Sequence, residues 1–196
     1  LENLVVYPHG SAARRPGTNF VAEVADSSKT TRLIPFEFST TQTYMLEFSN
    51  LKIRVFKDNG AVLEGDKTIS AITKANPAVV TATSHGYSNG DEVLISGVGG
   101  MTEVNGKRFL VADKTTNTFE LQDKDGTDIN SSAFTTYTSG GVSNKVFEIT
   151  TPYLEAELFD LKFAQSADVM YICHPNHELS IIPIWRWRRK NTFNNQ

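Results

Sequence analysis

Cys173, His174 and His177 are the residues whose types could bind a metal ion, because a thiolate and two imidazoles are ligands that zinc prefers. Cys173 and His174 are neighbours in a segment that reads as a strand, so their side chains are expected to point to opposite faces. The chain has no other cysteine that could complete a zinc site. We therefore predict no metal site and no cofactor, and we interpret Cys173 as a small buried residue.

The run Gly86–Gly90 reads Gly-Tyr-Ser-Asn-Gly and matches the nucleophile motif of hydrolases, with Ser88 in the place of the nucleophile. That chemistry needs a helix directly after the serine, to present its hydroxyl at a sharp turn. Here Asp91–Ser96 has the alternation of a strand instead. We predict a hairpin turn, no catalytic residue and no enzymatic activity.

The run Asp123–Asp128 reads Asp-Lys-Asp-Gly-Thr-Asp and resembles the start of a calcium-binding loop. An EF-hand loop needs glycine at its sixth position and glutamate at its twelfth. Asp128 and Phe134 occupy those positions in this chain. We interpret the run as a solvated turn, and calcium binding in some other geometry is the alternative.

Two basic groups could contact a nucleic acid or a membrane. Trp185–Lys190 alternates aromatic and cationic side chains, which suits single-stranded nucleic acid or an anionic membrane surface, and Arg14 and Arg15 precede a Pro-Gly turn. However, 19 Lys and Arg against 22 Asp and Glu give a net charge of −3, too low for electrostatic nucleic-acid binding by the whole chain. No apolar run approaches the roughly 18 residues of a membrane span.

The elements that would carry these residues read as short strands. In the first part of the chain, period-two alternation predicts an antiparallel meander, the unit from which propeller blades are built. Its predicted strands are Arg32–Phe38, Thr43–Phe48, Lys52–Phe56 and Ala61–Glu64. The pair Asn59–Gly60 predicts a two-residue hairpin turn, because both types tolerate positive φ angles.

From about residue 68 the chain becomes rich in Gly, Thr, Ser, Asn and Val, and turns recur at roughly ten-residue spacing, which indicates a small barrel. The predicted strands there are Ala78–Thr83, Glu92–Ser96, Arg108–Lys114, Thr118–Gln122 and Gly141–Val146. Further on, a helical turn over Glu155–Leu161 precedes a hairpin of Lys162–Gln165 and Val169–His174.

These patterns predict an all-β fold with a discontinuous, partly propeller-like outer region, residues 1–67 and 146–180. A small β-barrel, residues 68–145, is inserted into it, and residues 181–196 form a poorly ordered tail with nothing to pair with. The two connections to the barrel must then lie close together, so Glu64 and Phe147 are expected to be neighbours.

The middle segment resembles a known domain. It reads HGYSNGDEVLISGVGGMTEVNGKRFLV from His85, followed by TFELQD and YTSGG, and it is similar to the first catalytic-cysteine half-domain of ubiquitin-activating enzymes. The resemblance implies a small antiparallel barrel. It implies no activity here, because Cys173 lies outside the segment and the chain has no adenylate-binding α/β region.

The flanking segments resemble another family. NLVVYPHGSAARRPGTNFVAEV, RLIPFEFSTTQTYMLEF, IRVFKDNG and TPYLEAELFDLKFAQSADVMYICHPNH are similar to the N-terminal region of tail-nozzle proteins, of the tail tubular protein B type, from short-tailed phages and prophages. This resemblance implies a non-enzymatic structural component of a virion tail, also present in the bacterial cytoplasm when expressed from a prophage. Its partners would be other tail proteins or copies of itself. Relatives of this kind continue further, so a truncated product is expected.

The alternative is a binding module, in which the barrel recognises a carbohydrate or protein on a host surface. Tyr87, Phe134 and Tyr137 are then the candidate aromatic contacts. Exposed rings on one face of the barrel would favour this interpretation, whereas rings buried in its core would count against it. Neither interpretation involves a small-molecule substrate.

Overall fold

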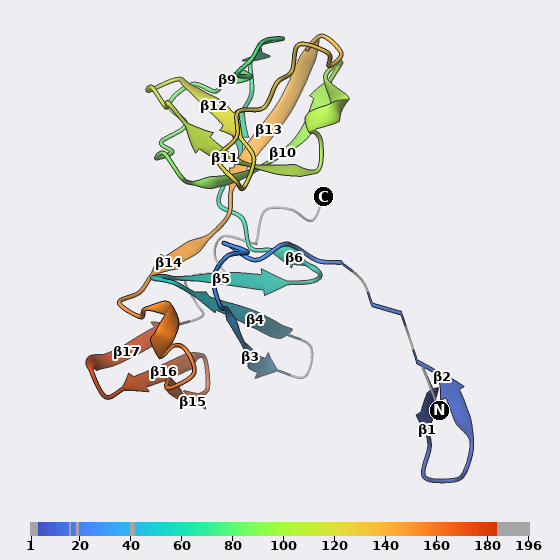
Figure 1. The fold of residues 1–196 in the computed structure, drawn as a ribbon, viewed down its shortest axis with the longest axis vertical. Coiled ribbons are helices and arrows are strands. Elements are labelled where there is room, and N and C mark those ends of the chain that lie inside the picture. Colours follow the sequence, from blue (N-terminus) through green and yellow to red (C-terminus); the bar gives the residue numbers. More distant parts are fainter. Residues whose placement is uncertain (1–3, 16, 19, 40–41, 184–196) are drawn as a thin grey trace.

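The computed structural model describes residues 4–15, 17–18, 20–39 and 42–183. The described chain forms antiparallel β-sheets together with two short 3-10 turns, η1 (Thr102–Val104) and η2 (Glu155–Glu157), which confirms the predicted all-β fold class. Figure 1 shows two β units joined by a narrow waist, and a separate hairpin near the N-terminus. Within the described ranges, no helix has the length and apolar character needed to cross a membrane.

The outer unit contains a sheet with the strand order β14-β5-β4-β3, and the short strand β6 pairs with β5. These strands are β3 (Arg32–Ser39), β4 (Gln42–Ser49), β5 (Lys52–Lys57), β6 (Gly60–Ala61) and β14 (Glu148–Thr150). Alternation turns Ile34, Leu46 and Val55 into a hydrophobic core, as the period-two pattern predicts. Leu33 and Met45 lie on the opposite face and are exposed.

The turn between β5 and β6 lies one residue earlier than predicted. Asp58 and Asn59 are its two central residues, with φ angles of 50° and 62°, and Lys57 pairs with Gly60. Two successive positive φ angles are typical of the hairpin turn that matches strand twist. Asp and Asn both tolerate this conformation, so the glycine becomes the partner of Lys57 instead of a central residue.

The outer unit also contains a three-stranded sheet of β15 (Lys162–Ser166), β16 (Val169–His174) and β17 (His177–Pro183). Met170, Ile172 and Ile182 from this sheet join the same hydrophobic core as the first sheet. The expectation that the chain beyond residue 180 pairs with nothing is therefore wrong for residues 181–183, because Ile182 lies opposite Met170 and is buried with it. Residues 184–196, which include Trp185–Lys190, lie outside the described residues.

The other unit is a curled sheet with the strand order β7-β13-β10-β11-β12-β9-β8. The strands are β7 (Lys67–Thr68), β8 (Ala71–Ile72), β9 (Val79–Thr81), β10 (Glu92–Gly99), β11 (Lys107–Ala112), β12 (Thr118–Gln122) and β13 (Ser139–Lys145). Its two end strands belong to one continuous segment, residues 67–72, which bonds to β13 at one end and to β9 at the other. The sheet thus curls until it meets itself around a second hydrophobic core.

The chain passes between the two units along a two-stranded neck. Leu63 and Val146 form an antiparallel bridge. On either side of it, the amide of Glu64 donates to the carbonyl of Lys145 at 2.7 Å, and the amide of Phe147 donates to the carbonyl of Val62 at 2.8 Å. The inserted unit therefore leaves and rejoins the outer unit at one place (Figure 1).

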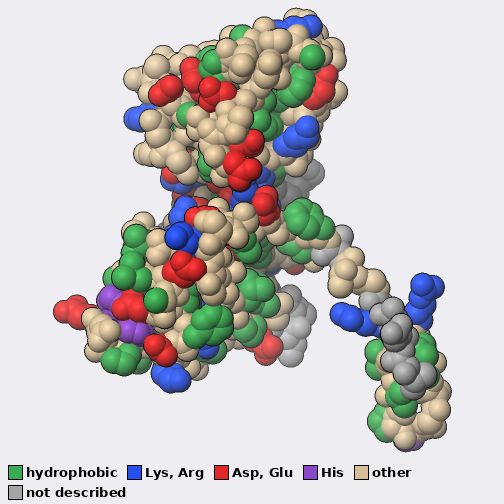
Figure 2. Space-filling view, in the orientation of Figure 1, with side chains coloured by type: hydrophobic (Ala, Val, Ile, Leu, Met, Phe, Trp, Pro, Cys, Tyr) green, Lys and Arg blue, Asp and Glu red, His purple; other side chains and the backbone are tan. Residues whose placement is uncertain are grey.

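A buried ionic network connects the two units beside this neck. Arg54 of β5 is fully buried, and its guanidinium donates to Glu47 of β4 at 2.7 Å and to Glu92 of β10 at 2.7 Å. It also donates to the carbonyl of Glu23, while Lys124 of the barrel lies 3.2 Å from Glu92. Figure 2 shows charged side chains gathered at the waist. One arginine thus bonds the outer sheet, the barrel and the segment that precedes β3.

Burial lowers the pKa of Arg54, but the hydrogen bonds and charges of Glu47 and Glu92 outweigh it, and the net effect is a raised pKa. The guanidinium is therefore charged throughout the normal pH range. A buried guanidinium is tolerated here because Glu47 and Glu92 balance its charge and the carbonyl of Glu23 accepts a further hydrogen bond from it.

We predict that Arg54→Met destabilises the protein by about 3–5 kcal/mol, because it removes the cation that pairs with the buried carboxylate of Glu47 and leaves Glu92 to Lys124. Urea-induced unfolding measures this change. Lys52→Met is the matched control: it lies two residues earlier on β5, and its ion pair with Glu148 at 3.1 Å is partly exposed. Loss of that pair is expected to cost less than about 1 kcal/mol. Equal effects of the two substitutions would show that the buried network has no special role.

Candidate functional site

The hairpin of β16 and β17 brings two histidines together. His174 ends β16, His177 begins β17, and only Pro175 and Asn176 separate them. The two histidines are direct cross-strand partners, so their side chains lie on one face of the hairpin, with ring centroids 5.0 Å apart. The tetrapeptide His-Pro-Asn-His is therefore enough to place two imidazoles side by side.

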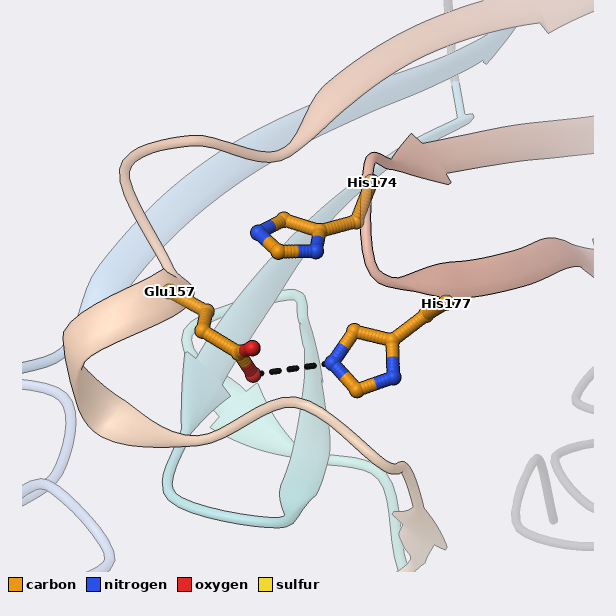
Figure 3. Close-up of side chains that lie close together, drawn as sticks. All are labelled: Glu157, His174 and His177. Carbon is orange, nitrogen blue, oxygen red and sulfur yellow. Dashed lines mark hydrogen bonds and ion pairs between the residues drawn. The ribbon is translucent and has the colours of Figure 1, made fainter.

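Glu157, the last residue of η2, completes a cluster with these two rings. Its carboxylate lies 2.9 Å from Nε2 of His177, and one potential ligand atom from each of the three residues lies within 4.8 Å of the others. Figure 3 shows the carboxylate and both rings facing one another. His174 is buried, whereas the side chains of Glu157 and His177 are 19% and 20% exposed, so the cluster opens to solvent on one side.

The surroundings hold this cluster in place. The amide of Leu154 donates to Glu157 at 2.9 Å, and this bond, followed by the contact with His177, holds the pKa of the Glu157 carboxyl below its ordinary value. Tyr153 is fully buried and presents its ring to His177 at 5.3 Å. Two imidazoles and a carboxylate in this arrangement can form an ion pair, and they are also a donor set for zinc-like cations.

The sequence singled out both histidines but paired them with the wrong third residue. Cys173 and His174 do lie on opposite faces, as expected, but Cys173 is exposed and not buried. The reason is the alternation in β16, which turns Met170, Ile172 and His174 inward and leaves Cys173 outside. Glu157 gave no sequence signal, because only the packing of η2 against the hairpin brings it near.

The run Gly86–Gly90 lies in the connection between β9 and β10, and the predicted hairpin does not form, because these strands pair with other strands and not with each other. Gly86 and Gly90 have positive φ angles of 74° and 86°, and the amide of Ser88 donates to the carboxylate of Asp91 at 2.8 Å. The strand β10 follows directly, so the strand–turn–helix geometry that would present Ser88 as a nucleophile does not form at this place.

The run Asp123–Asp128 closes on itself as a hydrogen-bonded turn. Asp123 accepts from the amides of Asp125 and Thr127, at 3.0 Å and 2.8 Å, and Asp128 accepts from the side chain of Gln122. The Asp123 carboxylate is thus engaged in capping the turn.

The three aromatic candidates of the barrel do not form an exposed cluster. Tyr87 is buried in the core and donates to the carbonyl of Ser143 at 2.8 Å. Phe134 and Tyr137 are half-buried and pack against the same core, and the Tyr137 hydroxyl donates to the backbone carbonyl of Ile69 at 3.1 Å. Their burial counts against a role as ligand contacts.

A groove of about 560 Å³ lies on the exposed face of the outer sheet. Its floor is apolar and comes from β3, β4 and β5, with Leu33 and Met45 59% and 37% exposed. Val21, from the segment before β3, closes one side. Pro35, Glu37 and Asp58 also line the groove.

The N-terminal hairpin stands apart from both units (Figure 1). It consists of β1 (Leu4–Val6) and β2 (Ala12–Arg14), which pair only with each other. Leu4, Val5 and Val6 are 41%, 45% and 58% exposed. Between the described residues, no hydrogen bond or ion pair joins this hairpin to the rest of the chain.

Comparison with protein families supports the barrel resemblance. The model of the ubiquitin-activating enzyme E1 FCCH domain matches residues 75–146, which covers most of the inserted unit. The match spans 72 of the 196 residues, well under half of the chain, and it excludes Cys173 and the Glu157–His174–His177 cluster. No curated protein matches the chain.

The identification of the flanking segments with phage tail proteins is wrong. The matching family model describes a domain of ubiquitin-activating enzymes, and nothing in the comparisons points to a tail protein. The short runs on which the identification with tail proteins rested lie mostly in strands and turns. Alternating apolar residues and tight turns recur in unrelated antiparallel sheets, which makes short matches of this kind misleading.

We predict that Tyr87→Phe lowers the free energy of unfolding by about 1 kcal/mol at neutral pH, since it removes a buried hydrogen bond to Ser143. Burial also raises the pKa of Tyr87 from 10.0 to about 12. Between these two values the unfolded phenol ionises while the native one keeps its proton, so this stabilisation is lost as pH rises.

Urea-induced unfolding of both proteins at about pH 9 and about pH 11 tests this assignment. The unsubstituted chain is expected to lose more stability over this interval than Tyr87→Phe does. An equal loss in the two proteins would mean that Tyr87 ionises as readily in the native state as in the unfolded state.

Proposed function

We propose that this chain is a non-enzymatic scaffold that associates with copies of itself, the N-terminal hairpin of one copy docking in the apolar groove of another. One observation carries the proposal: a hairpin with exposed apolar side chains and an open apolar groove occur on the same chain. Exchange of an identical element between copies is a common route to symmetric assemblies.

The N-terminal hairpin is not expected to be stable on its own. Two-stranded hairpins are marginally stable in water, because neither face is buried. Burial of a valine or leucine side chain contributes about 1.5–3 kcal/mol. Docking of Leu4 and Val6, which share one face of β1, onto a surface such as that of Leu33 and Met45 would supply this burial.

The charges of the two surfaces are complementary. Arg14 ends the second strand of the hairpin, and Arg15 follows it. Glu37 and Asp58 line the groove; Lys57, which also lines it, lies 3.5 Å from Asp58, and Arg54 neutralises Glu47, so Glu37 is the acidic group that faces the arginines. Opposite charges at the rim favour encounter and fix orientation more than they add affinity.

The face of the sheet is a better docking surface than its edge. β3 is the edge strand, but Pro35 within it has no amide hydrogen to offer a further strand. The side chain of Gln165 also bonds to both the amide and the carbonyl of Glu37. Edge-to-edge pairing is thereby blocked, whereas the apolar face stays open.

Recognition of a host-surface ligand by the barrel has weaker support, because its candidate rings are buried or half-buried. Self-association is therefore the function that the observations favour.

Analytical ultracentrifugation of the whole chain tests the proposal. The unsubstituted protein is expected to associate as its concentration rises. Val6→Asp in the hairpin and Met45→Asp in the groove should each abolish association, because each places a charge in the apolar contact. A mixture of the two variants should regain it, since each supplies the surface that the other lacks.

Leu179→Asp is the matched control, because Leu179 is 56% exposed and lies in β17, away from both surfaces. It should associate like the unsubstituted chain. A protein that remains monomeric at every concentration, or an assembly that survives both Val6→Asp and Met45→Asp, would refute the proposal. A hairpin that docks on its own groove would give the first of these results.

A further inference from the structure

We propose that Glu157, His174 and His177 bind one divalent metal ion of the zinc class, which clamps η2 to the hairpin of β16 and β17. The cluster contains neither the N-terminal hairpin nor the apolar groove, so this site is independent of self-association. Two imidazole nitrogens and one carboxylate oxygen are the donor types that zinc and its neighbours in the transition series prefer.

The distances need little adjustment. Ligands at about 2.1 Å from a tetrahedral ion lie about 3.4 Å from one another. Nε2 of His177 and the carboxylate of Glu157 are 2.9 Å apart, and every pair of ligand atoms in the cluster is within 4.8 Å. Side-chain rotations that move the ligand atoms by about an ångström would bring the three ligands around an ion. The open side of the cluster leaves the fourth coordination position to water.

The framework around the site is already rigid. Pro175 restricts the turn that joins the two histidines, and Tyr153 packs against the His177 ring at 5.3 Å. Arg32 of β3 donates to the carbonyls of Leu158 and Leu161, directly after η2, at 2.8 Å and 3.0 Å. An ion would therefore meet ligands whose backbone positions are fixed, which reduces the conformational entropy lost on binding.

The donor set also selects the kind of ion. Calcium takes six to eight oxygen ligands, and magnesium prefers oxygen ligands and water, so a site with one carboxylate and two imidazoles suits neither. Cys173 does not contribute, because it is exposed on the opposite face of β16 from His174.

One hydrogen bond must break when the ion binds. The amide of Asn176 donates to Nδ1 of His174 at 3.2 Å and so occupies the lone pair of that nitrogen. An ion on Nδ1 takes this lone pair for itself. An ion on Nε2 requires the ring proton to sit on Nδ1, which then cannot accept a hydrogen bond. In both cases the Asn176 amide loses its partner, which gives the site a specific signature.

Titration calorimetry of the whole chain with Zn²⁺, and the visible absorption of the Co²⁺-loaded protein, test the site. We expect one ion per chain, a tetrahedral Co²⁺ spectrum and a shifted Asn176 amide resonance. Glu157→Gln and His177→Gln keep the side-chain volume close to the original, and each is expected to weaken binding by about tenfold or more.

His9→Ala and Cys173→Ser are the controls, because they remove a histidine of the N-terminal hairpin and the exposed thiol. Both should bind Zn²⁺ like the unsubstituted chain. Binding that survives Glu157→Gln and His177→Gln, or that is lost in either control, would overturn the proposal.

Thermal unfolding of the unsubstituted chain keeps the test independent of how the variants fold. An ion that binds the native state raises the midpoint of unfolding as its concentration rises. No heat of binding, together with no rise of the midpoint at about 1 mM Zn²⁺, would also overturn the proposal, since about 1 mM lies far above the dissociation constants of structural zinc sites.

Discussion

The arrangement of the two β units depends on a single buried guanidinium. Arg54 is the point at which a strand of the outer sheet, the first residue of β10 and the segment before β3 meet, and its charge is balanced by Glu47 and Glu92. Hydrophobic contacts tolerate sliding, but a forked donor with carboxylates on two sides accepts only one geometry. The network therefore defines how the inserted barrel is oriented on its host. Charged residues lie at the centre of a junction that could have been apolar. Their contribution is a defined orientation of the two units more than added stability.

The outer sheet has two different faces, and the difference follows from its alternation. One face is sealed by the hairpin of β16 and β17, which contributes Ile172 and Ile182 to a shared core. The other face carries the Arg54 network at one end and the apolar groove at the other. A sheet in an ordinary monomer would show polar residues on its solvent face. The apolar character of this second face, next to a hairpin that lacks a core of its own, is what connects the fold to the proposed association of copies.

Much of the fold could be read from local patterns, and the functional arrangement could not. Period-two alternation predicted the observed bounds of β12 and β16. The glycines of the barrel occur both in its turns and within its strands. Gly141 lies inside β13 with a φ angle of 96°, and a Cβ there would lie 2.5 Å from the side chain of Val98, so the close approach of β10 and β13 requires glycine. By contrast, Glu92 and Arg54 are 38 residues apart. Their pairing depends on how two separately folded units meet, and no local pattern encodes that. The same is true of Glu157 beside His177.

The strand β17 was missed because its pairing partner was not recognised, although Ile182 keeps the correct alternation.

The neck between the units has an evolutionary consequence. Its outgoing and returning strands are hydrogen-bonded neighbours at Glu64 and Lys145, so the gap left by removing everything between them could be bridged by a tight turn. The host sheet would keep its strand order, and the excised barrel would keep the closing segment, residues 67–72, that completes its wall. Such a unit can be gained, lost or transferred between hosts as a cassette. This architecture accounts for the similarity to the E1 FCCH domain model being confined to residues 75–146, within the inserted unit.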